Sequence, residues 1–182
     1  MATAGKTIHN NISGFKLQWL KTANDTNGEY VQCRMWIDPK AYMPIRHIHP
    51  HQTETFEVVK GSLKLECDGI TTILLRNGNF TVPKGKPHQW WNSSDSSELE
   101  FIVTMTPAQN WDIQMEQTFG IMNDKGNLSF MQVMAMQKEY EMYIAGPPIV
   151  LQNLLSTILY PISRLMGLKK YYPEYSSGNF LL

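Results

Sequence analysis

Residues 44–61 read Pro-Ile-Arg-His-Ile-His-Pro-His-Gln-Thr-Glu-Thr-Phe-Glu-Val-Val-Lys-Gly, and this stretch decides the fold. His47 and His49 are two residues apart, so on a β-strand both imidazoles leave the same face. Glu54 follows a short polar link that could turn the chain, and a second predicted strand then ends at Gly61. Two imidazoles and a carboxylate that converge from adjacent strands form most of a coordination shell for a divalent transition metal.

A fourth ligand is expected from the segment Pro-Lys-Gly-Lys-Pro-His at residues 83–88. His88 lies in a strand-like run, because Gln-Trp-Trp-Asn follows it. The expected ligands of one metal ion are therefore His47, His49, Glu54 and His88. His51 shares the parity of His49, which leaves a shifted pair as an alternative. The spacing to Glu54 and to Gly61 favours the first pair, and His51 is then a rim residue.

Two ordered motifs carry a resemblance to a known superfamily. The pattern His47-x-His49-x4-Glu54-x6-Gly61 resembles the first signature of the cupin superfamily. The second signature is similar to Gly78-x4-Pro83-x-Gly85-x2-His88-x3-Asn92. The resemblance covers residues 30–106. It implies a mainly-β fold, a cupin-type double-stranded β-helix or jelly-roll barrel, and it implies a homodimer.

Two positions depart from the family pattern. Ala41 stands where the family usually has a glycine, and the gap between Gly78 and Pro83 is one residue shorter than usual. Both positions are expected in turns rather than at ligands.

The residue pattern itself also indicates a β-barrel. Apolar side chains alternate with polar ones over residues 30–38, which is the period of a β-strand. Asp68-Gly69 and Asn77-Gly78 are hairpin signals between further short strands. Strands and turns this regular predict a sandwich or a small barrel with room for one small ligand. We expect a flexible N-terminal segment at residues 1–12 and the barrel at residues 13–107.

After residue 107 the pattern becomes helical, and we expect a helical extension over residues 108–182. Helices are predicted at 109–119 and 128–144, and an apolar stripe of helical spacing runs from Leu151 to Leu165. Pro161 should kink or split this last helix. The extension could pack on the barrel or on a partner, or residues 147–172 could contact a membrane surface through the stripe and Lys169 and Lys170.

Composition excludes some classes of partner. The 16 basic and 16 acidic residues balance, so no nucleic-acid partner is expected. Cys33 and Cys67 lie in strand-like runs and are expected to be reduced core thiols of an intracellular protein. The first six residues contain no apolar run, so no signal peptide is expected and a cytoplasmic location is favoured.

Strand parity predicts the walls of the cavity for a small-molecule ligand. The side chains expected to face inward with the metal ligands are Met43, Ile45, Phe56, Val58 and Trp90. Arg34 and Trp36 share a face and could line the mouth, where Arg34 would anchor a substrate carboxylate. An exposed position on the outer face is the alternative for Arg34.

The expected donor set is three imidazoles and one carboxylate, which leaves open positions on an octahedral metal. Iron or manganese is preferred, while nickel, cobalt and zinc remain alternatives. A metal-dependent dioxygenase or related oxidoreductase is the favoured function, and an isomerase or decarboxylase remains open. Resemblance to cupin oxygenases implies that Glu54 could be a catalytic proton acceptor. The alternatives are a non-catalytic sensor and a scaffold whose helices dock a membrane or a protein, because this fold hosts many functions.

Overall fold

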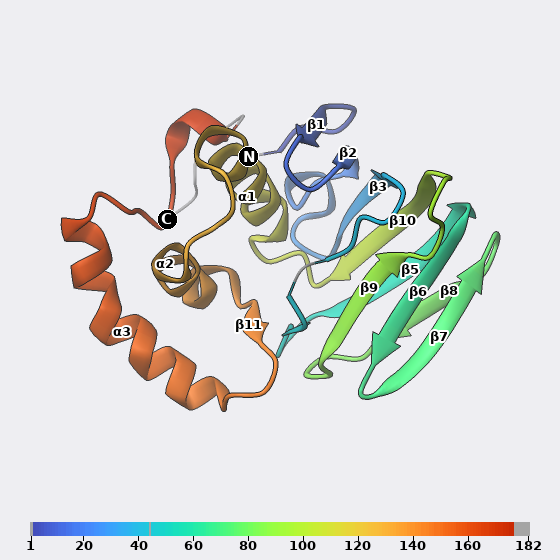
Figure 1. The fold of residues 1–182 in the computed structure, drawn as a ribbon. Helices are drawn as coiled ribbons and strands as arrows, with labels where there is room; N and C mark the ends of the chain where they lie inside the picture. Colours follow the sequence, from blue (N-terminus) through green and yellow to red (C-terminus); the bar gives the residue numbers. More distant parts are fainter. Residues whose placement is uncertain (1, 44, 177–182) are drawn as a thin grey trace.

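The protein consists of two facing antiparallel sheets with a helical layer on one side (Figure 1). The computed structural model describes residues 2–43 and 45–176. One sheet has the strand order β1-β2-β3-β10-β5-β8 and the other has the order β11-β4-β9-β6-β7. The predicted mainly-β jelly-roll fold with C-terminal helices is confirmed. The strands of the first sheet are β1 (Thr7–Asn10), β2 (Phe15–Lys21), β3 (Val31–Ile37), β10 (Leu99–Thr106), β5 (Thr53–Lys60) and β8 (Asn79–Val82).

The second sheet carries the remaining strands, which are β11 (Tyr143–Ile144), β4 (His47–Ile48), β9 (His88–Asn92), β6 (Ser62–Cys67) and β7 (Ile70–Leu75). Burial alternates along β3 and β10, so that one face of each strand points into the core. Cys33 lies on the buried face of β3, and both it and Cys67 are buried and free. Side chains between the two sheets therefore fill much of the barrel interior.

Two residues of the quoted motifs serve the fold. Gly61 turns the chain between β5 and β6 at a φ of 87°, and a Cβ there would lie 3.1 Å from the carbonyl oxygen of Glu98. The buried amide Nδ2 of Asn92 lies within hydrogen-bond distance of three backbone carbonyls, those of Ile37, Asp38 and Ser97, at 2.8–3.1 Å. Asn92 therefore holds the end of β9 against the loop that follows β3.

The N-terminal segment corrects one prediction. Thr7–Asn10 forms strand β1, which pairs with β2, so residues 7–10 belong to the sheet and are not a loose tail. Ile8 packs against the core, and Ala2 is also buried. The polar composition of the segment concealed this pairing, because a strand at the edge of a sheet needs few apolar side chains. Met1 lies outside the described residues.

The helical extension differs in detail from its prediction. Helix α1 (Trp111–Lys125) runs six residues further than expected, and helix α2 (Phe130–Tyr140) ends four residues earlier. Ser129 caps α2 by accepting a hydrogen bond from the backbone N–H of Gln132. The chain then forms β11, which pairs with β4. The extension thus adds a strand beside the predicted histidine strand, a feature that the helical pattern had hidden.

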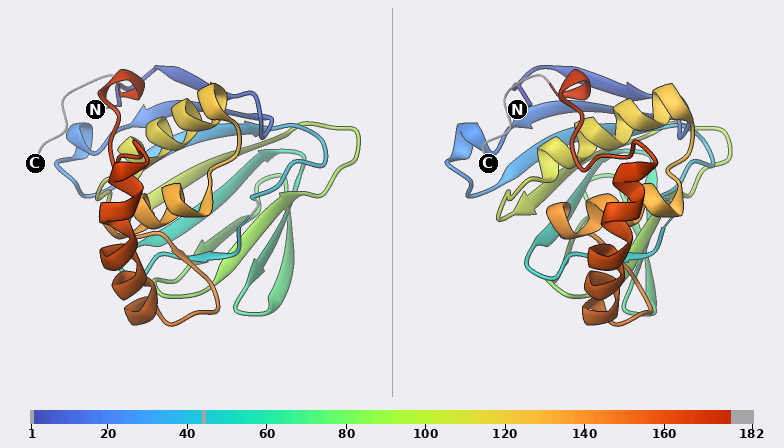
Figure 2. Two further views of the ribbon diagram at one scale, coloured as in Figure 1. Left: turned by 60° about the vertical axis from the view of Figure 1, so that its left-hand side comes forward. Right: turned by 90° about the vertical axis from the view of Figure 1, so that its left-hand side faces the viewer.

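Helix α3 (Ile149–Leu165) lies on the outer side of α2, away from the barrel (Figures 1 and 2). It continues through Pro161 rather than splitting there. Its buried face is polar: Gln137 of α2 donates a hydrogen bond to Ser156 Oγ at 2.6 Å and another to the carbonyl of Gln152 at 3.1 Å. Its apolar side chains are the exposed ones, with Leu165 90% exposed and Leu154 56% exposed.

The face of α3 that points to solvent is thus the one a helix normally buries. The expected contact of residues 147–172 with a membrane surface or a second copy stays a prediction. Within the part of the chain that the structure describes, no helix is long and apolar enough to cross a membrane. Residues 177–182 of the predicted extension lie outside the described residues.

Candidate metal centre

The four predicted ligands lie together at the helical end of the barrel. One possible ligand atom from each of His47, His49, Glu54 and His88 lies within 4.8 Å of the others, and all four residues are buried. His47 of β4 and His88 of β9 are directly opposite each other in the sheet register. Glu54 comes from β5, which belongs to the other sheet. The carboxylate therefore faces the histidines across the barrel and does not come from a strand next to β4, as was expected.

Backbone carbonyls orient two of the imidazoles. His47 Nδ1 lies 2.9 Å from the carbonyl oxygen of Ile45, and His88 Nδ1 lies 3.0 Å from that of Lys86. A carbonyl oxygen only accepts hydrogen bonds, so each Nδ1 carries the proton and donates it. The Nε2 atom of each ring is then the atom available at the centre, which is the usual arrangement of a metal-binding histidine and its hydrogen-bonded support.

The protonation of the group follows from burial and from Glu54. Burial and the nearby His88 lower the pKa of His49 to about 3. Burial, His88 and His49 also lower the pKa of His47 well below its usual value. These two rings are therefore neutral at pH 7 and offer lone pairs. The Nδ1 atom of His49 is buried and has no hydrogen-bond partner among the described residues.

His88 differs because it contacts the carboxylate directly. Its Nε2 lies 2.7 Å from Glu54 Oε2, whereas His49 Nε2 lies 3.9 Å from the same oxygen. Burial lowers the pKa of His88, but the hydrogen bond and the negative charge of Glu54 outweigh burial and raise it overall. The hydrogen bond places one proton between His88 Nε2 and Glu54 Oε2, and a bound cation would replace that proton.

The group could hold a metal ion, and its chemistry fits one. Three imidazole nitrogens and one carboxylate oxygen suit divalent iron, manganese, cobalt, nickel or zinc. Neither cysteine takes part in the group, unlike the cysteine-rich shells common in structural zinc sites. The exposed His51 pairs with Glu141 at 2.8 Å and lies outside the group.

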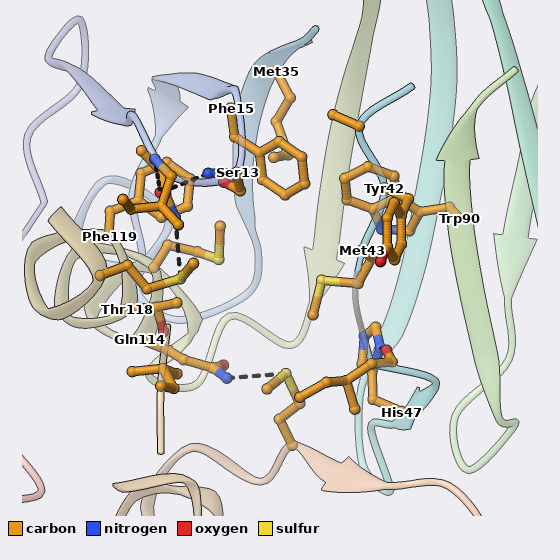
Figure 3. Close-up of a pocket in the computed structure, with 18 of the residues that line it drawn as sticks. Ser13, Phe15, Met35, Tyr42, Met43, His47, Trp90, Gln114, Thr118 and Phe119 are labelled. Carbon is orange, nitrogen blue, oxygen red and sulfur yellow. Dashed lines mark hydrogen bonds between the residues drawn. The ribbon is translucent and has the colours of Figure 1, made fainter. Parts of the chain in front are cut away.

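A cavity of about 440 Å³ opens from the metal group toward α1 (Figure 3). His47, His49 and Glu54 line one end of it. Apolar and sulfur-containing side chains make most of the wall, and they are Phe15, Met35, Tyr42, Met43, Ile45, Trp90, Trp111, Met115, Phe119, Met122, Leu128, Val133 and Met142. A largely apolar cavity with a few polar groups is the usual form of a small-molecule site.

The structure divides the predicted pocket residues into two sets. Met43, Ile45 and Trp90 line the cavity. Phe56 and Val58 face inward with Glu54, as parity predicts, but they are buried further along β5 and do not line it. The Phe56 and Phe101 rings, 5.8 Å apart, fill that part of the barrel.

Arg34 and Trp36 do not line the cavity either. Arg34 pairs with Glu100 at 3.0 Å, and Lys16 lies 4.0 Å from the centre of the Trp36 ring. Both side chains lie on the outer face of β3, where burial alternates with the inward residues. The predicted role of Arg34 as an anchor for a substrate carboxylate is therefore corrected, and its alternative position on the outer face is the observed one.

Sequence analysis missed the helical wall of the cavity. Six residues of α1 line it and are spaced as one helical face: Trp111, Gln114, Met115, Thr118, Phe119 and Met122. That spacing is visible in the sequence. The surface against which this face packs could not be predicted, because the sequence does not say at which end of the barrel α1 lies.

Comparisons with known proteins agree with this architecture. Residues 33–105 match the family model described as a cupin domain. An oxidoreductase of Arthrobotrys oligospora is 26% identical over an alignment of 158 residues, and the match covers 78% of this chain and 62% of that protein. The probable oxidoreductase patJ of Aspergillus clavatus is 27% identical over an alignment of 150 residues, and the match covers 74% of this chain and 46% of that protein. The chain thus spans about half of the length of these relatives.

Solved structures show the same fold. An RmlC-like cupin from Shewanella frigidimarina has a TM-score of 0.50 and 22% identity, and the match covers 62% of this chain and 94% of that one. A predicted oxalate decarboxylase from Thermotoga maritima has a TM-score of 0.50 and 16% identity, with 57% and 92% covered. The two facing sheets, the motif residues and these matches lead to one conclusion. The β-barrel of this protein has the cupin-type jelly-roll fold, and residues 33–105 within it match the cupin domain family.

Proposed function

We propose that this protein is a metal-dependent dioxygenase or related oxidoreductase that acts on a small molecule in the barrel cavity. The observation that carries the proposal is the position of the buried group of three histidines and Glu54 at one end of an apolar cavity of about 440 Å³. A structural metal site needs no such cavity, whereas a catalytic one needs space for a substrate beside the ion. The oxidoreductase names of distant relatives support the same reaction class.

A divalent iron or manganese ion at this site would supply a Lewis acid for substrate oxygens and a place for dioxygen to react. The protein supplies the rest. His47 and His49 are held neutral by burial, so they are ready to bind the ion without first losing a proton. The apolar walls exclude water from the reacting groups, which strengthens electrostatic interactions there.

Glu54 is the residue that we propose for proton transfer. It is the one acidic residue among the described residues that line the cavity, and it lies between His88 and the open space. A carboxylate at this point can accept a proton from a substrate hydroxyl or from an acidic C–H group. Glu54 Oε2 lies 2.7 Å from His88 Nε2, which is close enough for a proton to pass between the two residues.

Oxygen uptake tests the proposal. The metal-free protein is reconstituted separately with Fe²⁺, Mn²⁺, Ni²⁺, Co²⁺ and Zn²⁺, and dioxygen consumption is recorded with catechols, flavonols and diketones. We expect uptake with iron or manganese, and its loss in His49→Ala but not in His51→Ala. Saturable binding of these compounds without uptake under any metal would contradict the proposal and favour a binding module.

A further inference from the structure

A polar side chain lies in the cavity wall opposite the metal group. Gln114 projects from α1, is 5% exposed, and lines the cavity whose other end is formed by His47 and Glu54 (Figure 3). It is therefore a buried amide in a largely apolar wall. A buried amide is costly unless its hydrogen-bonding groups find partners.

Only half of this amide has a partner in the protein. Gln114 Nε2 donates to the sulfur of Met142 at 3.2 Å, while Oε1 has no partner among the described residues and is shielded from solvent. A thioether sulfur only accepts hydrogen bonds, so it fixes which way the amide points. The oxygen is thus the free end, and it requires a donor.

The cavity contains a second free polar atom. Ser13 Oγ is also buried without a partner in the described part of the chain, and Ser13 lines the same cavity on the side of α1 (Figure 3). Neighbouring amide groups are already satisfied, since Asn10 Oδ1 accepts from the backbone N–H groups of Ile12 and Ser13. Gln114 Oε1 and Ser13 Oγ are therefore two free polar atoms in the part of the cavity wall away from the metal group.

The charges of the lining residues limit the kind of ligand that the cavity can bind. None of the described residues that line the cavity is a lysine or an arginine. Arg34, the cation that was expected at the mouth of the cavity, is engaged by Glu100 on the outer face. A carboxylate or phosphate at the α1 end would be buried without a counter-ion, which is strongly unfavourable.

We propose that Gln114 is a substrate-specificity residue, whose Oε1 accepts a hydrogen bond from a hydroxyl or N–H group of a neutral, largely apolar substrate. The substrate's other end then lies at His47, His49 and Glu54. This placement of the substrate rests on the proposed function, whereas the hydrogen bond to Gln114 does not. Sites that hydrogen-bond a substrate hydroxyl reject the analogue without it, because the protein group is left unpaired.

Matched two-ring compounds test the inference by calorimetry of the full chain, loaded with metal and kept free of oxygen. The probes are 2,6-dihydroxynaphthalene, 2-naphthol, which lacks the distal hydroxyl, and 6-hydroxy-2-naphthoate, which replaces it with an anion. We expect the wild-type protein to bind the diol about tenfold more tightly than 2-naphthol, and the naphthoate more weakly than either.

Two variants remove the amide at nearly constant volume, Gln114→Leu and Gln114→Met. Both should lose the preference for the diol while keeping their affinity for 2-naphthol. Gln32→Leu is the control, because Gln32 bonds Thr104 on the outer face of β3 and should leave the preference unchanged. Melting curves identify a variant that fails to fold, and the comparison of probes on the wild-type protein stands without either variant.

Several results would overturn the inference: equal affinity for the diol and 2-naphthol, a preference that survives in a folded Gln114 variant, tight binding of the naphthoate, or no binding of any probe. Admitting oxygen separates this inference from the proposed function. Diol binding that depends on Gln114 without oxygen uptake would contradict the proposed reaction and support the role of Gln114. Oxygen uptake with unchanged selectivity in Gln114→Leu would support the proposed reaction and contradict the role of Gln114.

Discussion

The two walls of the cavity differ in their side chains and in their secondary structure. The barrel wall carries the three histidines and Glu54. The pairing of β4 with β9 and hydrogen bonds to backbone carbonyls hold His47 and His88 in position. The α1 wall carries mainly apolar side chains and one free amide on a helix that follows the barrel in sequence. The difference predicts that metal binding and ligand selectivity can be changed separately, because substitutions in one wall need not disturb the other.

The barrel wall should give the largest effect. Replacing His49 with alanine removes a ligand and leaves three, so we expect metal content to fall by an order of magnitude or more. Elemental analysis of the purified protein measures it. The matched control is His51→Ala, which alters an exposed histidine two residues away and should retain the metal. Unchanged stoichiometry in His49→Ala would refute the assigned ligand set.

Acid should weaken the metal-free protein through the same wall. In the folded state the pKa of His49 is about 3 and that of His47 is also well below 6.5, so unfolding lets both rings take up protons as the pH falls below about 6.5. The raised pKa of His88 acts in the opposite direction, but it is one ring against two. Melting temperature should therefore fall between pH 7 and pH 5.

A double variant sharpens that prediction. Replacing His47 and His49 together with glutamine removes the two groups with lowered pKa values, and the fall in melting temperature should become smaller or disappear. A fall of undiminished size would mean that other groups carry the pH dependence.

The barrel wall also depends on a residue with no part in the chemistry. Asn92→Ala leaves three backbone carbonyls without their shared donor, and we expect a loss of about 2 kcal/mol in the free energy of unfolding. Chemical denaturation measures it. Ser93→Ala, at the exposed next residue, should cost less than about 0.5 kcal/mol. Equal losses in the two variants would contradict the role given to Asn92.

The smallest effect is expected on the outer face of the helical layer. Leu154→Ser changes an exposed side chain of α3, so the free energy of unfolding of a monomer should change by about 0.5 kcal/mol or less. Ser156→Leu places bulk in the buried polar strip against Gln137 and should cost more. A large, concentration-dependent loss in Leu154→Ser would instead indicate that a second copy covers this face.

The buried group of three histidines and Glu54 could be predicted because it depends on short-range order. Residues 47, 49 and 54 are fixed by parity and by one turn, and His88 by a second motif, so few arrangements are possible. Strand β11 and the placement of α1 could not be predicted, because pairing with β4 and packing on the barrel depend on long-range contacts. The position of Arg34 agrees with the alternation along β3, because the apolar face that carries Cys33 and Met35 is the buried one, and the predicted role at the cavity mouth was wrong.

X-ray absorption of the protein loaded with Fe²⁺ or Mn²⁺ tests the central claim most directly. The account predicts a shell of nitrogen and oxygen atoms at about 2.0–2.2 Å that includes three imidazoles, with one imidazole lost in His88→Ala. A shell that contains sulfur, or one without imidazole scattering, would contradict it.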